Sequence, residues 1–360
     1  MQTGNQSGLD IDLGNHCSQI AFNWAKKTFA NRNGKAGEIA MKIDGAFANV
    51  MNFNGLKIGI SSDGIGTKIE LAERTGIYNT LGFDLTAMTI DDLVVGGLVP
   101  TSISNIIDVD VLDTQIIDDL MDGLHQAANT AQIAITGGEI AELGSRINGY
   151  GHRMHFNWCA TAIGVLHPAI DNPIDGSALQ EGDIVIALQS RGFRSNGFSA
   201  VRRIMQACFG DMWHTIPYDS NRSWGQVLLT PCLIYAPLIV SLLDEGIIPK
   251  GIAHITGGGI ADNFRRVLKV NQLGVDLDNL FEPHDFMKNL QDMGHISNEQ
   301  AYTWWNMGNG MLLVVSAADV LKTLAHIKNK EYNAKAAGKI IAEKTIRIKT
   351  ADNQILTTLY

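Results

Sequence analysis

The 360-residue sequence lacks the features that mark membrane, secreted or nucleic-acid-binding proteins. No apolar run reaches the roughly 18 residues that a membrane-spanning helix needs, and the polar stretch 1–15 has no apolar signal-peptide core. Basic residues are few, with 28 Lys and Arg against 37 Asp and Glu, which gives a net charge of −9. This charge argues against nucleic acid or an anionic membrane as the main partner. We expect a cytoplasmic protein that acts on small molecules.

Cysteine and proline are also scarce. The four cysteines, at 17, 159, 208 and 232, form no C-x-x-C pair, so the sequence suggests neither a zinc knuckle nor a disulfide framework. We interpret them as reduced thiols in a cytosolic protein. Glycine, by contrast, is abundant, with 37 residues against 8 prolines. Many backbone positions are therefore expected to need unusual angles or a close approach to a ligand.

The chain is longer than one hydrophobic core usually serves, so we expect two domains. Strand-like and helix-like segments alternate in both halves, and the Pro- and Gly-containing stretch 167–182 separates them. We place an N-terminal domain at 1–168 and a C-terminal domain at 169–360, and predict the α+β class, although a pure α/β fold is hard to separate from it. Predicted strands are 56–61, 102–111, 132–136, 156–166, 183–188, 251–255 and 311–316; predicted helices are 84–95, 114–130, 198–207, 232–245 and 318–329.

The clearest local motif is S-S-D-G-I-G-T-K at 61–68, where a strand leads into an acid, two glycines and a lysine. Glycines allow backbone N–H groups to converge on phosphate oxygens. Lys68 could neutralise phosphate charge, and Asp63 could hold the Mg²⁺ that accompanies a nucleotide. A plain β-turn with a solvated lysine explains the octapeptide equally well.

A predicted helix carries the second motif, with Asp84, Asp91 and Asp92 beside an apolar run. Carboxylates in apolar surroundings need a cation or hydrogen-bond donors. For Asp91 and Asp92 we favour a metal or substrate, whereas Asp84 could equally be the helix N-cap.

Two paired-glycine segments follow. In T-G-G-E at 136–139, the glycines suggest a turn between a strand and a helix start, with Glu139 facing a ligand or simply favoured at the helix end. In H-I-T-G-G-G at 254–259, a strand passes through glycines into a helix N-terminus, a geometry that binds anions. His254 could act as an acid, a base or a phosphate donor, or be only a hydrogen-bonded structural residue. The turns 194–197 and 306–310 are weaker candidates, and 152–155 reads as a surface loop.

Taken together and in order, these motifs resemble the aminoimidazole ribonucleotide synthetase family. The resemblance begins at G-L-D-I-D-L-G-N (8–15) and covers nearly the whole chain. It continues through S-D-G-I-G-T-K (62–68), G-F-D-L-T-A-M (82–88), D-L-V-V (92–95), G-G-E-I-A-E (137–142), S-N-G (195–197), A-H-I-T-G-G-G (253–259) and N-M-G (306–308).

The resemblance implies a homodimer that pairs through the N-terminal domains, which would also bind ATP. It implies ATP-driven closure of the imidazole ring of formylglycinamidine ribonucleotide in purine biosynthesis. Asp63 and Asp92, with Asp91 as a further ligand, would hold Mg²⁺, while Lys68 and His254 would serve the reaction along with Asp63. Contacts with ATP or substrate would come from Gly64, Gly66, Thr67, Gly137, Gly138, Glu139, Ser195, Asn196, Thr256, Gly257, Gly258, Gly259 and Asn306.

The sequence departs from the family pattern at five places. Asp91 stands where the family has Asn, Ile140 replaces Thr, and Gly144 begins a Gly-Ser where Pro-Gly is usual. Asn157 replaces an Asp, and Thr303 stands where an Arg is common. These departures keep two alternatives open. One is a related ATP-using enzyme with another substrate, such as selenophosphate synthetase, thiamine monophosphate kinase or a hydrogenase-maturation dehydratase; the other is a non-catalytic homologue.

Overall fold

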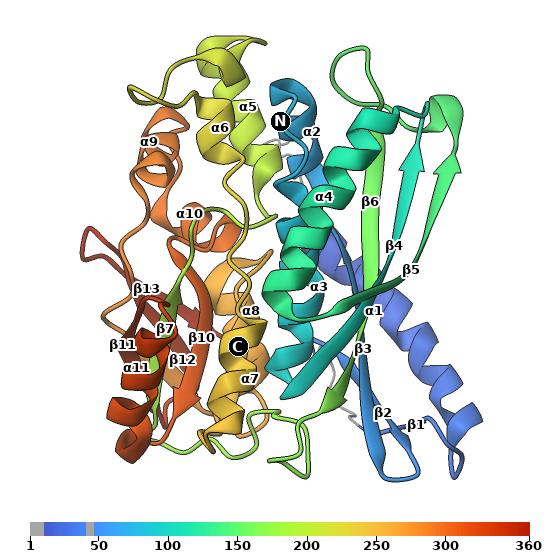
Figure 1. The fold of residues 1–360 in the computed structure, drawn as a ribbon. Coiled ribbons are helices and arrows are strands. Elements are labelled where there is room, and N and C mark those ends of the chain that lie inside the picture. The colour runs from blue at the N-terminus through green and yellow to red at the C-terminus, as the bar shows by residue number, and fades with distance from the viewer. Residues whose placement is uncertain (1–10, 41–46) are drawn as a thin grey trace.

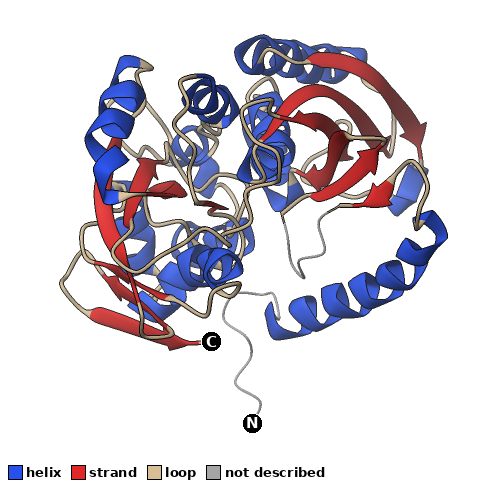
Figure 2. Cartoon of the chain, turned by 90° about the horizontal axis from the view of Figure 1, so that it is seen from below, coloured by secondary structure: helices blue, strands red, loops and turns tan. Residues whose placement is uncertain are grey.

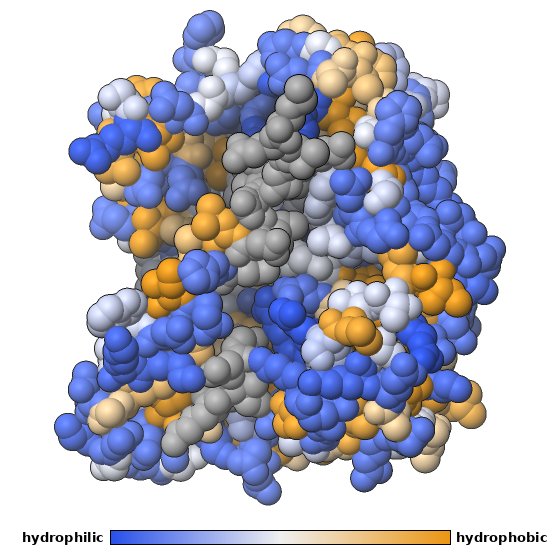
Figure 3. Space-filling model, turned by 180° about the vertical axis from the view of Figure 1, so that it is seen from behind, coloured by the Kyte–Doolittle hydropathy of each residue, from blue (hydrophilic) through white to orange (hydrophobic). Residues whose placement is uncertain are grey.

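The computed structural model describes residues 11–40 and 47–360, which form two halves, each built on its own sheet (Figure 1). Residues 8–10 of the motif at 8–15 lie outside the described residues, and its remaining residues form the first turn of α1. In the described part, no helix is both long and apolar enough to cross a membrane. Seen from behind, the surface is mostly hydrophilic, with apolar residues in small separate groups (Figure 3).

The first half holds a six-stranded sheet in the order β1-β2-β3-β6-β4-β5, in which only β4 and β5 are parallel. Its strands are β1 Glu38–Ile39, β2 Asn49–Phe53, β3 Leu56–Gly64, β4 Leu98–Val109, β5 Ala134–Glu142 and β6 Phe156–Leu166. Its helices are α1 Ile11–Thr28, α2 Ile69–Thr75, α3 Leu81–Val95 and α4 Thr114–Ala131, with a 3-10 turn, η2, at Gly66–Lys68. Figures 1 and 2 place α3 and α4 on one face of the sheet and α1 on the other side.

The second half holds a seven-stranded sheet in the order β13-β12-β9-β11-β7-β10-β8, mostly antiparallel. Its strands are β7 Ile184–Gln189, β8 Gly251–His254, β9 Gly274–Leu277, β10 Asn309–Val315, β11 Ala334–Ile341, β12 Thr345–Lys349 and β13 Ile355–Leu359. Its helices are α5 Phe198–Phe209, α6 Trp224–Leu228, α7 Ala236–Asp244, α8 Gly259–Leu268, α9 Asp285–Met293, α10 Asn298–Trp304 and α11 Val320–Asn329. Two mixed sheets with helices confirm the α+β prediction.

Helix α3 joins the two halves. Its sequence is apolar around nearly its whole circumference, which is typical of a helix buried on all sides. It contacts β3, β4 and β6 of the first sheet and also α7 and β8 of the second half. Phe83 and Asp92 alone among its residues are not fully buried. The position of Asp92 is therefore a partly open point on an otherwise enclosed helix.

Two local predictions were wrong. The glycine pair 137–138 does not form a turn but lies inside β5, and the segment after β5 forms only a 3-10 turn, Gly144–Arg146, and no α-helix. The helix predicted from residue 232 begins at Ala236, with Pro237 in its first turn. Proline suits the start of a helix because the first N–H groups have no intrahelical partner. Residues 230–235 belong to no helix or strand.

Candidate active site

Asp63 and Asp92 form an acidic pair where the first sheet meets α3. Asp63 lies near the end of β3, and its carboxylate accepts a hydrogen bond from its neighbour Gly64 N–H at 2.7 Å. Burial, opposed by the hydrogen bond from Gly64 and supported by the charge of Asp92, raises the pKa of Asp63 to about 7. Burial likewise raises the pKa of Asp92 to about 7, although nearby Arg266 and Arg194 partly offset it. The positive charges near the two carboxylates therefore compensate their negative charge only in part.

A buried chain of polar contacts continues from Asp92. The Nδ1 atom of His254, at the end of β8, lies 2.8 Å from Asp92 Oδ1. The Nε2 atom of the same ring lies 2.7 Å from Arg194 Nη2, which also contacts Asp91 Oδ2 at 2.8 Å. Because a guanidinium can only donate, Nε2 accepts and the ring proton is on Nδ1, facing the Asp92 carboxylate. Both nitrogens of His254 are therefore engaged.

His254 is neutral in this network. Its ring is fully buried, and burial together with the charge of Arg194 lowers its pKa to about 3. A neutral ring with both nitrogens bonded has no site for accepting a proton from a substrate. The geometry thus favours a positioning role for His254, which holds the carboxylate of Asp92 in place.

Both carboxylate oxygens of Asp91 accept hydrogen bonds from other parts of the protein. Its Oδ1 accepts hydrogen bonds from the N–H groups of Tyr235 and Ala236, at 3.0 and 2.9 Å, where α7 begins. Its Oδ2 accepts from Arg194, and the side chain is wholly buried. A carboxylate at a helix N-terminus is favoured by the exposed N–H groups and the helix dipole. With both oxygens occupied, Asp91 ties α3 to α7 and is not oriented toward Asp63.

Lys68 is also engaged inside the protein. Its Nζ lies 2.8 Å from both oxygens of Asp84 and 2.7 Å from the carbonyl oxygen of Thr230. The side chains of Lys68 and Asp84 are fully buried. Asp84 is therefore not the cap of α3, which begins at Leu81 after Thr80. In this conformation the ammonium of Lys68 neutralises Asp84 and does not face solvent.

Three glycine-containing segments converge beside the acidic pair. Gly66 and Thr67 are exposed, and a Cβ on Gly66 would lie 4.0 Å from the carbonyl oxygen of Ser195. A Cβ on Gly257 would lie 3.3 Å from Asn196 Oδ1. Backbone from both halves thus lines one area in which N–H groups are available to an anion.

The glycine run after β8 has a distinct shape. Gly258 and Gly259 adopt positive φ, and a Cβ on Gly259 would lie 1.9 Å from the carbonyl oxygen of Tyr302. Asn263 fastens the loop by donating to the carbonyl oxygens of Gly257 and Gly259. Thr256, Gly257 and Gly258 remain accessible ahead of α8, as expected for an anion-binding helix start.

The remaining predicted residues lie apart from this cluster or serve the fold. Gly138 is in register with Asn105, Ala160 and Asp63, so three strand spacings of about 4.8 Å separate it from Asp63. Glu139 is exposed beside Gly138 on the edge strand. Asn306 is buried and bonds to Ser190 and Gly192, holding the turn before β10.

A cavity of about 310 Å³ opens next to Asp63 on the face of the first sheet that α3 and α4 do not cover. Its lining combines hydroxyl groups with apolar surface, as ligand pockets commonly do. Ser62 and Thr161 share a hydrogen bond of 2.8 Å within it. The lining residues are Ser62, Asp63, Ser104, Ile106, Cys159, Ala160 and Thr161.

Sequence reasoning missed Arg194, which links Asp91 to His254. The residue was visible as the start of the Arg-Ser-Asn-Gly turn, but nothing in its neighbours indicated a buried ion pair. It adopts a positive φ of 59°, which is rare for a residue with a long side chain. This conformation accompanies a side chain that donates to Leu233, Asp91 and His254 at once.

Comparison with known proteins gives consistent matches. Residues 39–166 match the family described as AIR synthase related protein, N-terminal domain, and residues 180–350 match its C-terminal domain. A phosphoribosylformylglycinamidine cyclo-ligase of Thermococcus kodakarensis is 31% identical over 349 residues, which cover 97% of this chain and 98% of the relative. One from Carboxydothermus hydrogenoformans is 32% identical over 346 residues, covering 94% and 96%.

Solved structures share the fold at lower identity. A chain of the HypE–HypF complex superposes with a TM-score of 0.63 and 18% identity, covering 93% of this chain and 98% of that one. AaThiL complexed with AMPPCP and TMP gives a TM-score of 0.60 and 12% identity, covering 94% and 96%. At these identities the likeness concerns the fold.

Proposed function

Because this chain belongs to the AIR synthase related family, we propose that it is an ATP-dependent cyclo-ligase that converts formylglycinamidine ribonucleotide to aminoimidazole ribonucleotide. The observation that carries the proposal is the acidic pair Asp63 and Asp92 placed beside glycine segments from both halves. This arrangement suits a nucleotide, which brings both phosphates and a divalent cation.

The donor set fits Mg²⁺. Carboxylate oxygens are the ligands that Mg²⁺ prefers, and it usually takes one or two from protein, with phosphate and water completing the shell. Among the residues that the structure describes, no cluster of three or more acidic, His or Cys side chains could hold a metal without a bound nucleotide. We assign the ion to the two carboxylates of Asp63 and Asp92 together with the phosphate oxygens, whose charge the ion would neutralise. Asp91 would remain paired with Arg194.

The reaction joins two ends of one substrate. ATP transfers its terminal phosphoryl group to the formamide oxygen, the amidine nitrogen attacks the activated carbon, and phosphate leaves with that oxygen. The protein needs chiefly to align these ends and to offset charge. The N–H groups of Gly66, Thr67, Gly257 and Gly258 would bind phosphate oxygens, and Asn196 would orient the substrate. His254 would keep Asp92 in place.

Two further features concern the position of ATP and the assembly of two copies. The cavity beside Asp63 would take the nucleoside part of ATP. The face of the first sheet that α3 and α4 do not cover carries the exposed apolar side chains Ile106 and Ile163, so we propose that two copies pair through it as a homodimer. Four free cysteines fit a reducing compartment, and we assign the enzyme to the cytoplasm.

One assay tests the activity. Purified protein is incubated with formylglycinamidine ribonucleotide, ATP and Mg²⁺, and aminoimidazole ribonucleotide, ADP and phosphate are quantified. Equal amounts of the three products, dependent on both Mg²⁺ and the ribonucleotide, are expected. ATP hydrolysis without the imidazole product, even at high enzyme concentration, would contradict the assignment.

A further inference from the structure

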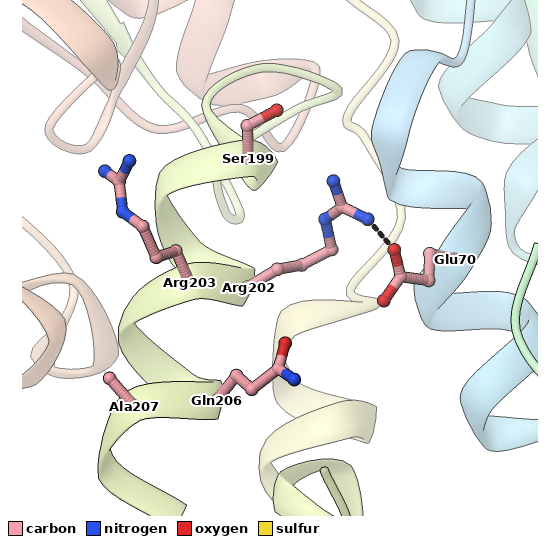
Figure 4. A pocket seen from close by; sticks show the side chains of 6 residues that line it. All are labelled: Glu70, Ser199, Arg202, Arg203, Gln206 and Ala207. Atoms are coloured by element: carbon pink, nitrogen blue, oxygen red, sulfur yellow. Dashed lines mark ion pairs between the residues drawn. The ribbon is translucent and has the colours of Figure 1, made fainter. Parts of the chain in front are cut away.

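Two cavities outside the candidate active site carry charged side chains, and they differ in how the charges are arranged. The larger, of about 460 Å³, lies on α5 and faces α2. Figure 4 shows that Arg202 points toward Glu70 and that Arg203 points the opposite way, so the lining does not gather its charges in one place. The smaller, of about 200 Å³, lies in the second half of the molecule, where side chains of both charge signs surround one small space.

The smaller cavity forms where a central strand of the second sheet stops before its neighbours. Strand β9 ends at Leu277, while β11 on one side and β12 on the other continue past it. The segment 278–282 therefore leaves the sheet between two strands that still run on. Lys335 of β11 and Lys349 of β12 line the cavity from these two strands, and the segment itself supplies an acidic side chain at each of its ends.

The two lysines of the cavity have no carboxylate partner among the residues that the structure describes. Lys335 Nζ lies 3.2 Å from Asn279 Oδ1 and 5.0 Å from the centre of the Phe281 ring, and both of these groups are uncharged. Lys349 is exposed and forms no hydrogen bond or ion pair with a described residue. Ammonium groups that line a cavity without a counter-charge attract a negative group. This side of the cavity therefore fits a carboxylate.

The acids of the cavity, Asp278 and Glu282, are also not paired with its lysines. In the described part of the chain, Asp278 has no ion pair, and Glu282 pairs with Lys288, which does not line the cavity, at 3.3 Å. Opposite charges thus line one small space without contacting each other. A ligand that carries a positive and a negative group could contact both sides at once, and each contact would be a charge-assisted hydrogen bond.

Tyr302 of α10 adds an uncharged donor and marks where the cavity lies relative to the candidate active site. Burial raises the pKa of its hydroxyl to about 12, although a hydrogen bond from the N–H of Ala351 opposes the shift. The hydroxyl is therefore protonated at neutral pH and can donate. The carbonyl oxygen of Tyr302 lies so close to Gly259 that a Cβ there would overlap it. A molecule in the cavity would thus contact a residue that supports the glycine loop from behind.

We propose that this cavity binds a small zwitterion of the α-amino acid class, with its carboxylate at the two lysines and its ammonium group at the two acids. A free α-amino acid carries both charges at neutral pH. The volume of about 200 Å³ is smaller than that of sites for drug-sized ligands, so we expect a ligand smaller than a nucleotide. The site is separate from the acidic pair, and the proposal does not depend on the proposed function.

Isothermal titration calorimetry on the full chain, without nucleotide, tests the ligand class. The probes are glycine, L-serine and L-asparagine, compared with acetate, which has only the carboxylate, and methylammonium, which has only the positive charge. At least one amino acid should bind saturably at one site per chain, and each half-ligand should bind about tenfold more weakly or worse, because it lacks one charge-assisted contact. No saturable binding of the three amino acids, or acetate binding as tightly as they do, would overturn the proposal.

Two variants test the location of the site. Lys349→Gln and Asp278→Asn each remove one charge, and both side chains are exposed, so the fold should be retained; matching thermal unfolding curves check this. Each should raise the Kd of the amino acid about tenfold or more. The controls are Lys339→Gln, an exposed lysine of β11 outside the cavity, and Asp118→Asn on α4, which should leave the Kd within about twofold. Wild-type affinity in both cavity variants, or an equal loss in the controls, would overturn the site. Because no nucleotide or ribonucleotide is present, these outcomes are independent of the cyclo-ligase assay.

Discussion

Asp63 and Asp92 are held in surroundings that favour their neutral forms, which makes them sensitive to pH and to cations. Their pKa values are raised from 3.8 to about 7 in the folded chain. The native state therefore binds more protons than the unfolded state between about pH 4 and pH 7. The stability that these carboxyls contribute is fully present below about pH 4 and is lost as the pH rises through about 7.

We predict that Asp63→Asn raises the melting temperature of the ligand-free protein at pH 8 but abolishes Mg²⁺-ATP turnover. The amide removes a charge that is costly when buried, at the expense of the cation site. Added Mg²⁺ with ATP should stabilise wild type at pH 8 and not the variant. Differential scanning calorimetry at pH 5 and pH 8 gives the comparison, with the exposed Asp118→Asn as control. Full activity in Asp63→Asn would contradict the metal assignment.

The ion pair of Asp91 with Arg194 gives a prediction about stability. Arg194→Leu should lower the free energy of unfolding by about 3–5 kcal/mol, since it leaves a buried carboxylate without its counter-charge. The double variant Asp91→Asn/Arg194→Leu should be less destabilised than Arg194→Leu alone, because Asn can still accept from Tyr235 and Ala236 N–H. Urea unfolding of the four proteins in a double-mutant cycle measures the coupling. Strictly additive effects would show that the pair is not coupled.

At this scale the sequence indicated which residues are special but not their partners. Asp63, Asp92 and His254 stood out through spacing within short motifs. Lys68 also stood out, yet its contacts come from Asp84 and from the carbonyl oxygen of Thr230, far along the chain. Only tertiary packing decides whether a lysine after a glycine turn faces a ligand or a buried acid.

Secondary-structure elements were predictable where a periodic apolar pattern was long. The prediction for β6 has the observed bounds, and the helix 114–130 ends one residue short of α4. The error at Gly137 and Gly138 has a local cause. A Cβ at these positions would lie 3.1 Å from Ser104 Oγ and 3.0 Å from Asn105 Nδ2. The glycines of β5 thus make room for side chains of the neighbouring strand. The same glycine pair in a sequence is also typical of a turn, which explains the wrong prediction.

Glycine also sets the packing of α3 on α4. A Cβ on Gly123 would lie 1.9 Å from the carbonyl oxygen of Asn79, and one on Gly82 would lie 2.2 Å from the backbone of Gly123. We predict that Gly123→Ala lowers the free energy of unfolding by about 1–3 kcal/mol, because the two helix backbones must separate. Gly14→Ala on α1 is the control, since its Cβ would meet nothing within 4 Å. Chemical denaturation measures both, and equal stability of Gly123→Ala and wild type would contradict the close contact.

At the scale of the whole molecule, the sequence indicated two halves but not how they join. Helix α3 carries Asp91 to the start of α7 and Asp92 to the end of β8, so the candidate site exists only when the halves are assembled. The spacing of two adjacent aspartates cannot reveal that their side chains face different partners in the second half. Buried contacts between distant segments depend on the complete fold.

We predict that two copies of the protein pair through the first sheet. On the face of the first sheet that α3 and α4 do not cover, Ile163 of β6 is 42% exposed and Ile106 of β4 is 46% exposed. Apolar side chains that gather on an open sheet face are typical of an interface. If two copies pair there, Ile163→Glu should place a charge in the contact and shift the protein from dimer to monomer in light scattering after size-exclusion chromatography.

Leu321→Glu distinguishes this contact from general surface effects, because Leu321 is 82% exposed on α11 of the other half. It should leave the dimer unchanged. The cavity beside Asp63 opens on the same face and shares Ile106, so a partner there would enclose bound nucleotide. The monomeric Ile163→Glu protein should therefore have a higher KM for ATP than the wild-type protein has. A monomeric wild-type protein would contradict the dimer. An Ile163→Glu protein that stays dimeric with normal ATP kinetics would show that the dimer forms through another surface.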